Sequence, residues 1–166
     1  MNPRIVVLEM AKLEAAHLTG LVEQFLDLLE EPSIPTTPSD PAVARLVPDA
    51  YPDDSEAGVE FRSVTQGDLL QRRRSDAETV LADLVDDGAR LVVEELDDSA
   101  ATTAMTVRLD SERAAAWLRT LTALRLVLAT RLGITHEHDH DHDDPRFGVY
   151  DWLGFRLEGL LQALDD

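Results

Sequence analysis

Four histidines alternate with acids over residues 136–144, which read HEHDHDHDD. The histidines are His136, His138, His140 and His142. In an extended chain alternate side chains point to the same side, so four imidazoles would line one side and carboxylates the other. Imidazole and carboxylate ligands suit zinc, nickel, copper or iron. The run therefore predicts a site for a divalent transition metal.

The same run also fits a hydrated, His/Asp-rich loop near residues 135–147 that joins two helices. A specific metal site holds its ligands in a fixed geometry through further hydrogen-bond partners. The flanking sequence predicts no such frame, and a His-rich loop of this kind binds metals weakly and incidentally. Metal binding or metal sensing is therefore the alternative function, and the sequence requires no cofactor.

A second set of residues belongs to the types that dominate protein-binding surfaces, arginine and the aromatics. Its members are Arg45, Tyr51, Phe61, Arg62 and Trp152. Most of them lie in residues 40–65, a stretch with three prolines that follows no helix or strand period. They could equally form a corner of the core, with the arginines paired to acids. We take the set as the hypothetical partner-binding site.

No motif in the sequence supports catalysis. The chain has no cysteine, so it has no thiolate nucleophile, no thiol switch and no disulfides. It contains no Gly-x-Ser-x-Gly elbow, P-loop or dinucleotide fingerprint. We therefore expect a protein that is not an enzyme.

The charge limits the partners. The chain has 33 acidic and 15 basic residues, a formal net charge of −18. A protein that binds duplex DNA normally presents a basic face to the phosphates, so direct DNA binding is disfavoured. The run Arg72 to Arg74 is expected to lie on a solvated helix side, paired with acids. With no long apolar run and no leader, we expect no membrane contact and a cytoplasmic location.

Helical periodicity dominates the chain. Leucine and alanine favour helices, and apolar residues recur at steps of three and four in several segments. The predicted helices cover residues 11–30, 41–46, 55–61, 65–88, 111–132 and 149–164. A Pro-rich linker near residues 32–40 follows the first of them. We predict a mainly α fold, a single-domain helical bundle over residues 1–166 with about four to six helices.

Short β-branched runs at residues 4–8, 91–93 and 105–107 predict a small two- or three-stranded β element. A hairpin of the last two is one option, and a helix in the first half of residues 89–109 is the other. Seven identities relate residues 7–28 to residues 107–128 at an offset of 100. They indicate either two strand–helix units about a pseudo-twofold axis or shared helix composition. The long apolar helices also allow a homodimer.

Several short motifs occur in order along nearly the whole chain. They are the Leu-rich segment 18–29, Asp40-Pro41-Ala42, Arg45-Leu46, residues 48–54 (PDAYPDD), Glu60-Phe61-Arg62, Thr65, Ala116-Trp117-Leu118, residues 124–128 (LRLVL), Thr130-Arg131-Leu132-Gly133 and Tyr150-Asp151-Trp152-Leu153. In these motifs the chain resembles the actinobacterial domain-of-unknown-function family numbered twenty-seventeen, whose genes commonly lie beside that of the proteolytic adaptor ClpS.

The resemblance implies a small, mostly helical protein with a regulatory role. Some relatives, of the AosR type, are regarded as oxidative-stress transcriptional regulators that act through a sigma factor. It therefore implies a protein partner, such as a sigma factor or another part of the transcription machinery. This chain departs from the family by lacking cysteine, by the pair Thr122-Ala123 where the family tends to have Asn-Asp, and by its His-Asp run. The favoured function is regulation in transcription or stress response through protein–protein interaction.

Overall fold

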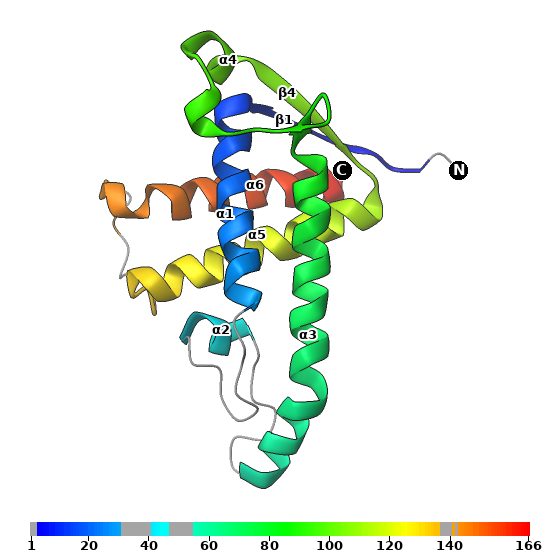
Figure 1. The fold of residues 1–166 in the computed structure, drawn as a ribbon, viewed down its shortest axis with the longest axis vertical. Coiled ribbons are helices and arrows are strands. Elements are labelled where there is room, and N and C mark those ends of the chain that lie inside the picture. The colour runs from blue at the N-terminus through cyan, green and yellow to red at the C-terminus, as the bar shows by residue number, and fades with distance from the viewer. Residues whose placement is uncertain (1–2, 31–40, 47–54, 137–140, 142) are drawn as a thin grey trace.

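The computed structural model of the chain describes residues 3–30, 41–46, 55–136, 141 and 143–166, and only the backbone of residues 55–66. The elements, in chain order, are β1 (Val6–Ala11), α1 (Lys12–Glu30), α2 (Pro41–Leu46), α3 (Ser55–Asp83), β2 (Val85–Asp86), β3 (Ala89–Arg90), the 3-10 helix η1 (Val93–Glu95), α4 (Asp98–Thr102), β4 (Ala104–Leu109), α5 (Ser111–Leu132), the 3-10 helix η3 (Pro145–Phe147) and α6 (Gly148–Asp165) (Figure 1). Within the described residues, the prediction of a mainly α fold with a small β element is confirmed.

The helix ends agree with local capping chemistry. The carboxylate of Asp110 accepts a hydrogen bond from the backbone N–H of Arg113 at 2.8 Å, which caps the start of α5. The same helix ends at Gly133, whose φ of 73° is in the left-handed region that glycine adopts without strain. Both caps agree with the predicted helix at residues 111–132. Helices α1, α2 and α6 also lie within one residue of their predicted bounds.

The helix α3 corrects one prediction. We expected two helices, at residues 55–61 and 65–88. The backbone is instead helical without a break from Ser55 to Asp83. No proline lies in this segment, and one glycine inside a helix, such as Gly67, costs only about 1 kcal/mol relative to alanine. Such a cost weakens a helix but does not divide it.

The strand pairing excludes one of the two options left open for residues 89–109. Residues 91–93 do not pair with residues 105–107, because β4 pairs with β1, antiparallel over six residue pairs from Val6↔Leu109 to Ala11↔Ala104. The hairpin lies earlier, where β2 and β3 flank Asp87 and Gly88, with φ of 49° and 77°. Asp-Gly with positive φ at both positions is typical of a two-residue hairpin turn. Gly88 was predicted to stop a helix.

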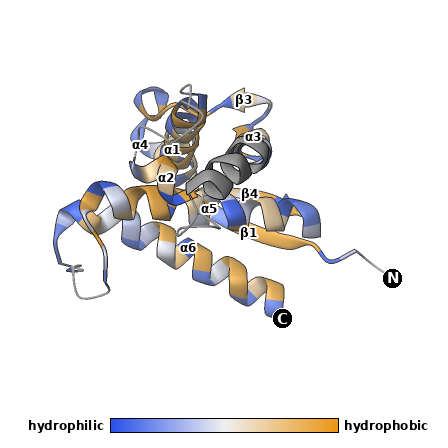
Figure 2. Cartoon of the chain, turned by 90° about the horizontal axis from the view of Figure 1, so that it is seen from below, coloured by the Kyte–Doolittle hydropathy of each residue, from blue (hydrophilic) through white to orange (hydrophobic). Residues whose placement is uncertain are grey.

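A continuous hydrophobic core joins the two strands to the long helices. Helix α5 lies at its centre and contacts α3, α6 and α2 (Figure 1). The largest fully buried side chains are Trp117, Leu18, Leu84, Leu109, Leu153 and Leu160. Hydrophobic residues continue along α6 to its C-terminal turns (Figure 2). Among the described residues, none of the helices has the length and apolar character that a membrane crossing requires.

The units β1–α1 and β4–α5 have the same order and paired strands, as two units about a twofold axis would. Their burial patterns match at an offset of 99, not 100. Pairs buried on both sides are Ala15 and Ala114, Leu18 and Trp117, Val22 and Leu121, and Phe25 and Leu124. At an offset of 100, buried Val22 would align with exposed Thr122. The seven identities therefore reflect composition, although the two-unit arrangement itself is present.

Candidate functional site

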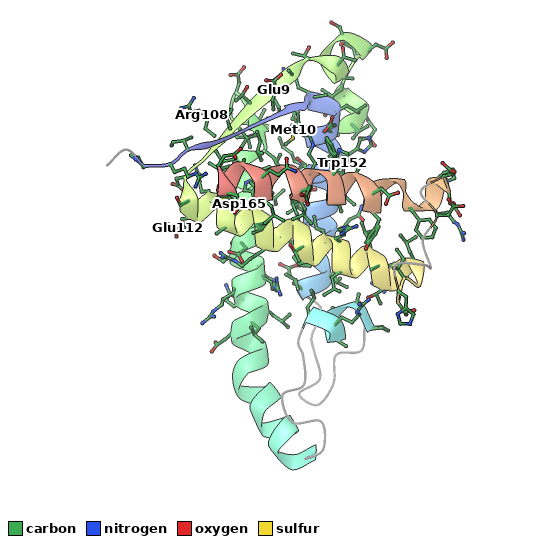
Figure 3. All side chains as sticks on the ribbon, turned by 180° about the vertical axis from the view of Figure 1, so that it is seen from behind. Glu9, Met10, Arg108, Glu112, Trp152 and Asp165 are labelled. Carbon is green, nitrogen blue, oxygen red and sulfur yellow. The ribbon has the colours of Figure 1, made fainter. Side chains whose placement is uncertain are left out.

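Glu14, in the first turn of α1, fixes α1 to α6. Its Oε2 accepts hydrogen bonds from Trp152 Nε1 at 3.2 Å and from Arg156 Nε at 3.1 Å, and Arg156 Nη2 also donates to it. Arg156 Nη1 donates to the carbonyl of Glu9 at 3.1 Å, at the end of β1. Trp152 and Arg156 are one helical turn apart, so they reach the carboxylate from the same face of α6. Figure 3 shows Trp152 close to the end of β1, where Met10 is labelled.

The same arrangement recurs between α3 and α5. Trp117 Nε1 donates to Asp83 Oδ2 at 2.9 Å, and Arg113 Nη2 lies 3.1 Å from Asp83 Oδ1. Arg113 and Trp117 are again one turn apart on one helix, and the carboxylate again comes from another helix. Trp117 is only 1% exposed, whereas Trp152 is half-buried. The second tryptophan is therefore the one that reaches the surface.

An apolar groove of about 440 Å³ lies beside Trp152. Its lining includes Leu13, His17 and Gly20 of α1, Val93 of η1, and Val149 and Trp152 of α6. The α1 residues that line it run from Leu13 to Gln24, a length of about 16 Å at 1.5 Å per residue. Leu13 and Val149 are 36% and 45% exposed. The groove thus displays apolar side chains of both α1 and α6 and extends along three turns of α1.

Gly20 keeps the middle of this groove open. A Cβ atom added there would meet no atom within 4 Å. Glycine in a helix interior is less stable than alanine by about 0.5–1 kcal/mol. Packing within the chain therefore gives no reason for glycine at this position.

The surroundings of the groove are acidic. Glu94 and Glu95 are exposed and directly follow Val93. Nearby bases are engaged: Lys12 Nζ lies 2.7 Å from Asp86, and Arg90 pairs with Glu23. The hydrogen bond to Asp86 raises the pKa of Lys12 above its ordinary value. The groove therefore combines an apolar lining with a negative edge.

Trp152 lies in this groove, and Arg45, the other predicted partner-binding residue whose side chain the structure describes, is not part of its lining. Arg45 is exposed on α2, and its Nη1 donates to Thr130 Oγ1 of α5 at 3.0 Å, a hydroxyl where an acid was expected. Tyr51 lies outside the described residues. Phe61 and Arg62 lie on α3, but their side chains also lie outside them.

The sequence analysis missed Leu13, Glu14, Gly20 and Val149. Leu13 and Val149 carried only the general signal of an apolar helix position. Gly20 carried a sharper one, because glycine inside a strongly helical segment calls for a local reason. Glu14 had no sequence signal, since its partner Trp152 lies 138 positions away.

The predicted metal ligands are largely outside the described residues. His136 is exposed, while His138, His140 and His142 are not described. In the ranges that the structure covers, no group of three potential ligands gathers. Asp144, which ends the run, binds Arg146 instead, with Arg146 Nη2 at 2.7 Å. The metal site stays a prediction.

This Asp144–Arg146 contact gives a pH-dependent prediction. Hydrogen bonds from the side chain and then the backbone of Arg146 lower the pKa of the Asp144 carboxyl. Because the pKa of Asp144 is lower in the folded than in the unfolded protein, its ionised carboxylate stabilises the folded state. This stabilisation is present above the unfolded-state pKa of about 3.9 and is lost as the pH falls through the folded-state pKa. We expect Arg146→Gln to return the Asp144 pKa toward its ordinary value, as followed by NMR titration of the carboxyl carbon.

Exposed Arg108 of β4 provides the control, because Arg108→Gln should leave the titration of Asp144 unchanged. An Asp144 pKa that is the same with and without Arg146 would contradict the assignment.

Of the three consecutive arginines on α3, Arg74 forms the expected ion pair with an acid. Arg74 Nη1 pairs with Glu30 Oε1 at 3.1 Å, which links α3 to the end of α1. Arg72 is exposed and Arg73 is half-buried. The run therefore contributes at least one arginine to an intramolecular ion pair.

Comparison with known proteins places the chain in a family. The family described as Domain of unknown function (DUF2017) matches residues 1–164. This range includes all the helices and strands described above, except for the last residue of α6. Neither the curated proteins nor the solved structures contain a match. Because the family match spans almost the whole chain, the protein belongs to the DUF2017 family.

Proposed function

We propose that the protein is a non-enzymatic regulatory protein that acts by binding a protein partner in the groove between α1 and α6. The observation that carries this proposal is the gathering of Leu13, Val149 and Trp152 in one apolar groove at the surface. Exposed apolar groups gathered within a polar rim are typical of interaction sites. Tryptophan is among the residues that dominate binding energy at such sites.

The chemistry of the groove favours binding over catalysis. Its lining is mainly apolar, and its one acid, Glu14, is held by donors from Trp152 and Arg156. A carboxylate held in this way is suited to fixing two helices together. His17 is exposed and can meet a partner at the edge of the groove.

The family resemblance supports a role in transcription or stress response in an actinobacterial cytoplasm. The partner would then be a sigma factor or another component of the transcription machinery. A net charge of −18 supports action through a protein rather than through direct contact with DNA phosphates.

Photo-crosslinking in the cells that make the protein tests the proposal. A photoreactive residue at position 17 is expected to give a discrete adduct with one partner. The same residue at position 106 is the matched control, because Thr106 is exposed on β4, outside the groove lining. If position 17 gives no adduct and gentle affinity purification recovers only the protein itself, the proposal fails.

A further inference from the structure

We propose that the α1–α6 groove binds a short, basic amphipathic helix of the partner, with an apolar side chain of that helix packed over Gly20. The inference rests on the proposed function and names the chemistry of the occupant. Three independent features carry it: the length of the groove, the open glycine and the charge around it.

The length of the groove suits a partner helix of about three turns. Its α1 wall covers residues 13 to 24, about 16 Å or three helical turns. A helix that docks in a groove uses anchors at i, i+3, i+4 and i+7, which extend over about two turns. The rest of the lining is short and comes from Val93 of η1 and from Gly148, Val149 and Trp152 of α6. The long side of the groove is therefore α1.

Gly20 allows that face to approach α1 closely. Glycine at a ligand contact lets another group reach the backbone. A comparison with the other helical glycines shows where a neighbouring side chain fills the space beside the glycine. At Gly154 an added Cβ would lie 3.0 Å from the guanidinium of Arg125 on α5, so a neighbouring side chain occupies the space there. Gly20, Gly67, Gly148 and Gly159 have no such neighbour. Gly20 and Gly148 line the groove, but Gly148 is the first residue of α6, whereas Gly20 lies in the interior of α1.

The charge of the groove edge selects a basic helix. Glu94 and Glu95 are exposed beside Val93, and the nearby bases Lys12 and Arg90 already form ion pairs. Lysines or arginines that flank the apolar face of the partner would meet these acids. Complementary charge of this kind speeds association and fixes orientation, and it weakens with added salt.

The same charge disfavours a second copy of the chain as the occupant. Two copies that meet through this groove would each bring a net charge of −18 to the contact. A symmetric dimer through this groove would also bring the acidic edges of both copies into the same contact. Self-association is therefore the competing outcome of the test.

The test uses a synthetic, tryptophan-free helical peptide of about three to four turns, with one leucine–alanine face and lysine and arginine flanks. Binding is followed through tryptophan emission, because Trp152 lines the groove whereas Trp117 is 1% exposed. We expect saturable binding that weakens as salt is raised. A scrambled peptide of equal charge without an apolar face should bind at least about tenfold more weakly, a difference of about 1.4 kcal/mol.

The decisive variants are Gly20→Leu and Gly159→Leu. Both replace an open helical glycine and neither changes the charge, but only Gly20 lines the groove. We expect Gly20→Leu to weaken peptide binding about tenfold or more, and Gly159→Leu to change it less than about twofold. Gly20→Ala, which adds a single methyl group in open space, should fold at least as stably and lose affinity by a smaller factor. Thermal melts of all variants verify the fold.

Equal peptide affinity for the two leucine variants would overturn the inference, and so would equal binding of the scrambled peptide. Concentration-dependent dimerisation that Gly20→Leu abolishes would overturn it in favour of a second copy. These failures differ from failure of the proposed function, which is judged by the cellular adduct at position 17 and does not depend on the peptide.

Discussion

Replacement of Trp117 by alanine is expected to lower the free energy of unfolding by about 3–5 kcal/mol, the usual range for a large aromatic residue truncated in a core. Trp117 is 1% exposed and sits on α5, the helix that contacts α2, α3 and α6. The substitution leaves a cavity and also removes the N–H donor to Asp83 at 2.9 Å. Urea denaturation followed by circular dichroism measures the loss.

Trp152→Ala is the matched comparison. Both tryptophans donate to a carboxylate that also binds an arginine one turn away, but Trp152 is only half-buried. Less apolar surface returns to water when it is truncated, so its loss should be clearly smaller. Equal losses for the two variants would contradict the assignment of Trp117 to the core and Trp152 to the groove.

The two tryptophan–carboxylate–arginine arrangements explain how the helices are held at two junctions. Asp83 is the last residue of α3, where the helix dipole disfavours a negative charge, and its side chain is only 5% exposed. Donors from Trp117 and Arg113 offset that cost. Glu14 lies in the first turn of α1, where the dipole favours a carboxylate. Its donors come from Trp152 and Arg156, and Trp152 stays half-buried in the lining of the groove.

The helices were predictable because their signals are local. The three- and four-residue apolar period, Asp110 as N-cap and Gly133 as stop all act within one or two turns of the chain. The predicted helix ends were wrong where the same residues fit two local structures. Gly88 can stop a helix or complete an Asp-Gly hairpin, and only the ladder between β2 and β3 shows which one occurs.

The pairing of β1 with β4 could not be read from sequence, because the strands lie about 100 residues apart and short β-branched runs carry no partner information. The internal repeat shows the same limit. Identity at an offset of 100 came from alanine and leucine composition, whereas the buried positions of the two units match at an offset of 99.

Of the residues that line the candidate site, the sequence predicted only Trp152, and it did not predict how the groove is formed. Trp152 was chosen by residue type, which is informative because tryptophan dominates binding surfaces. Leu13 lies in the helix predicted at residues 11–30, and its apolar period does not reveal which apolar residues another helix leaves uncovered. That depends on where the N-terminal turns of α6 lie, and Glu14 fixes this position from 138 residues away.

Removal of the Glu14 carboxylate is expected to release this junction. Hydrogen bonds to a charged group contribute about 1.5–3 kcal/mol each. Because the Glu14 side chain is 35% exposed, Glu14→Ala should cost about 1.5–2 kcal/mol, in the lower part of that range. Glu23→Ala is the matched control on the same helix. Its partner Arg90 is 58% exposed, so the loss should be about 0–1 kcal/mol.

A double-mutant cycle between Glu14 and Arg156 separates the ion pair from the loss of either side chain alone. We expect the double variant to be less destabilised than the sum of the single variants by about 0.5–3 kcal/mol, the range for residues in contact. Strict additivity would mean that the pair does not hold α6 to α1. Because Trp152 would also lose its acceptor, Glu14→Ala should shift its emission and weaken the basic peptide, whereas Glu23→Ala should do neither. The position of α6 and the binding of the peptide would then depend on the same carboxylate, because α6 forms part of the groove lining and Glu14 holds α6 in place.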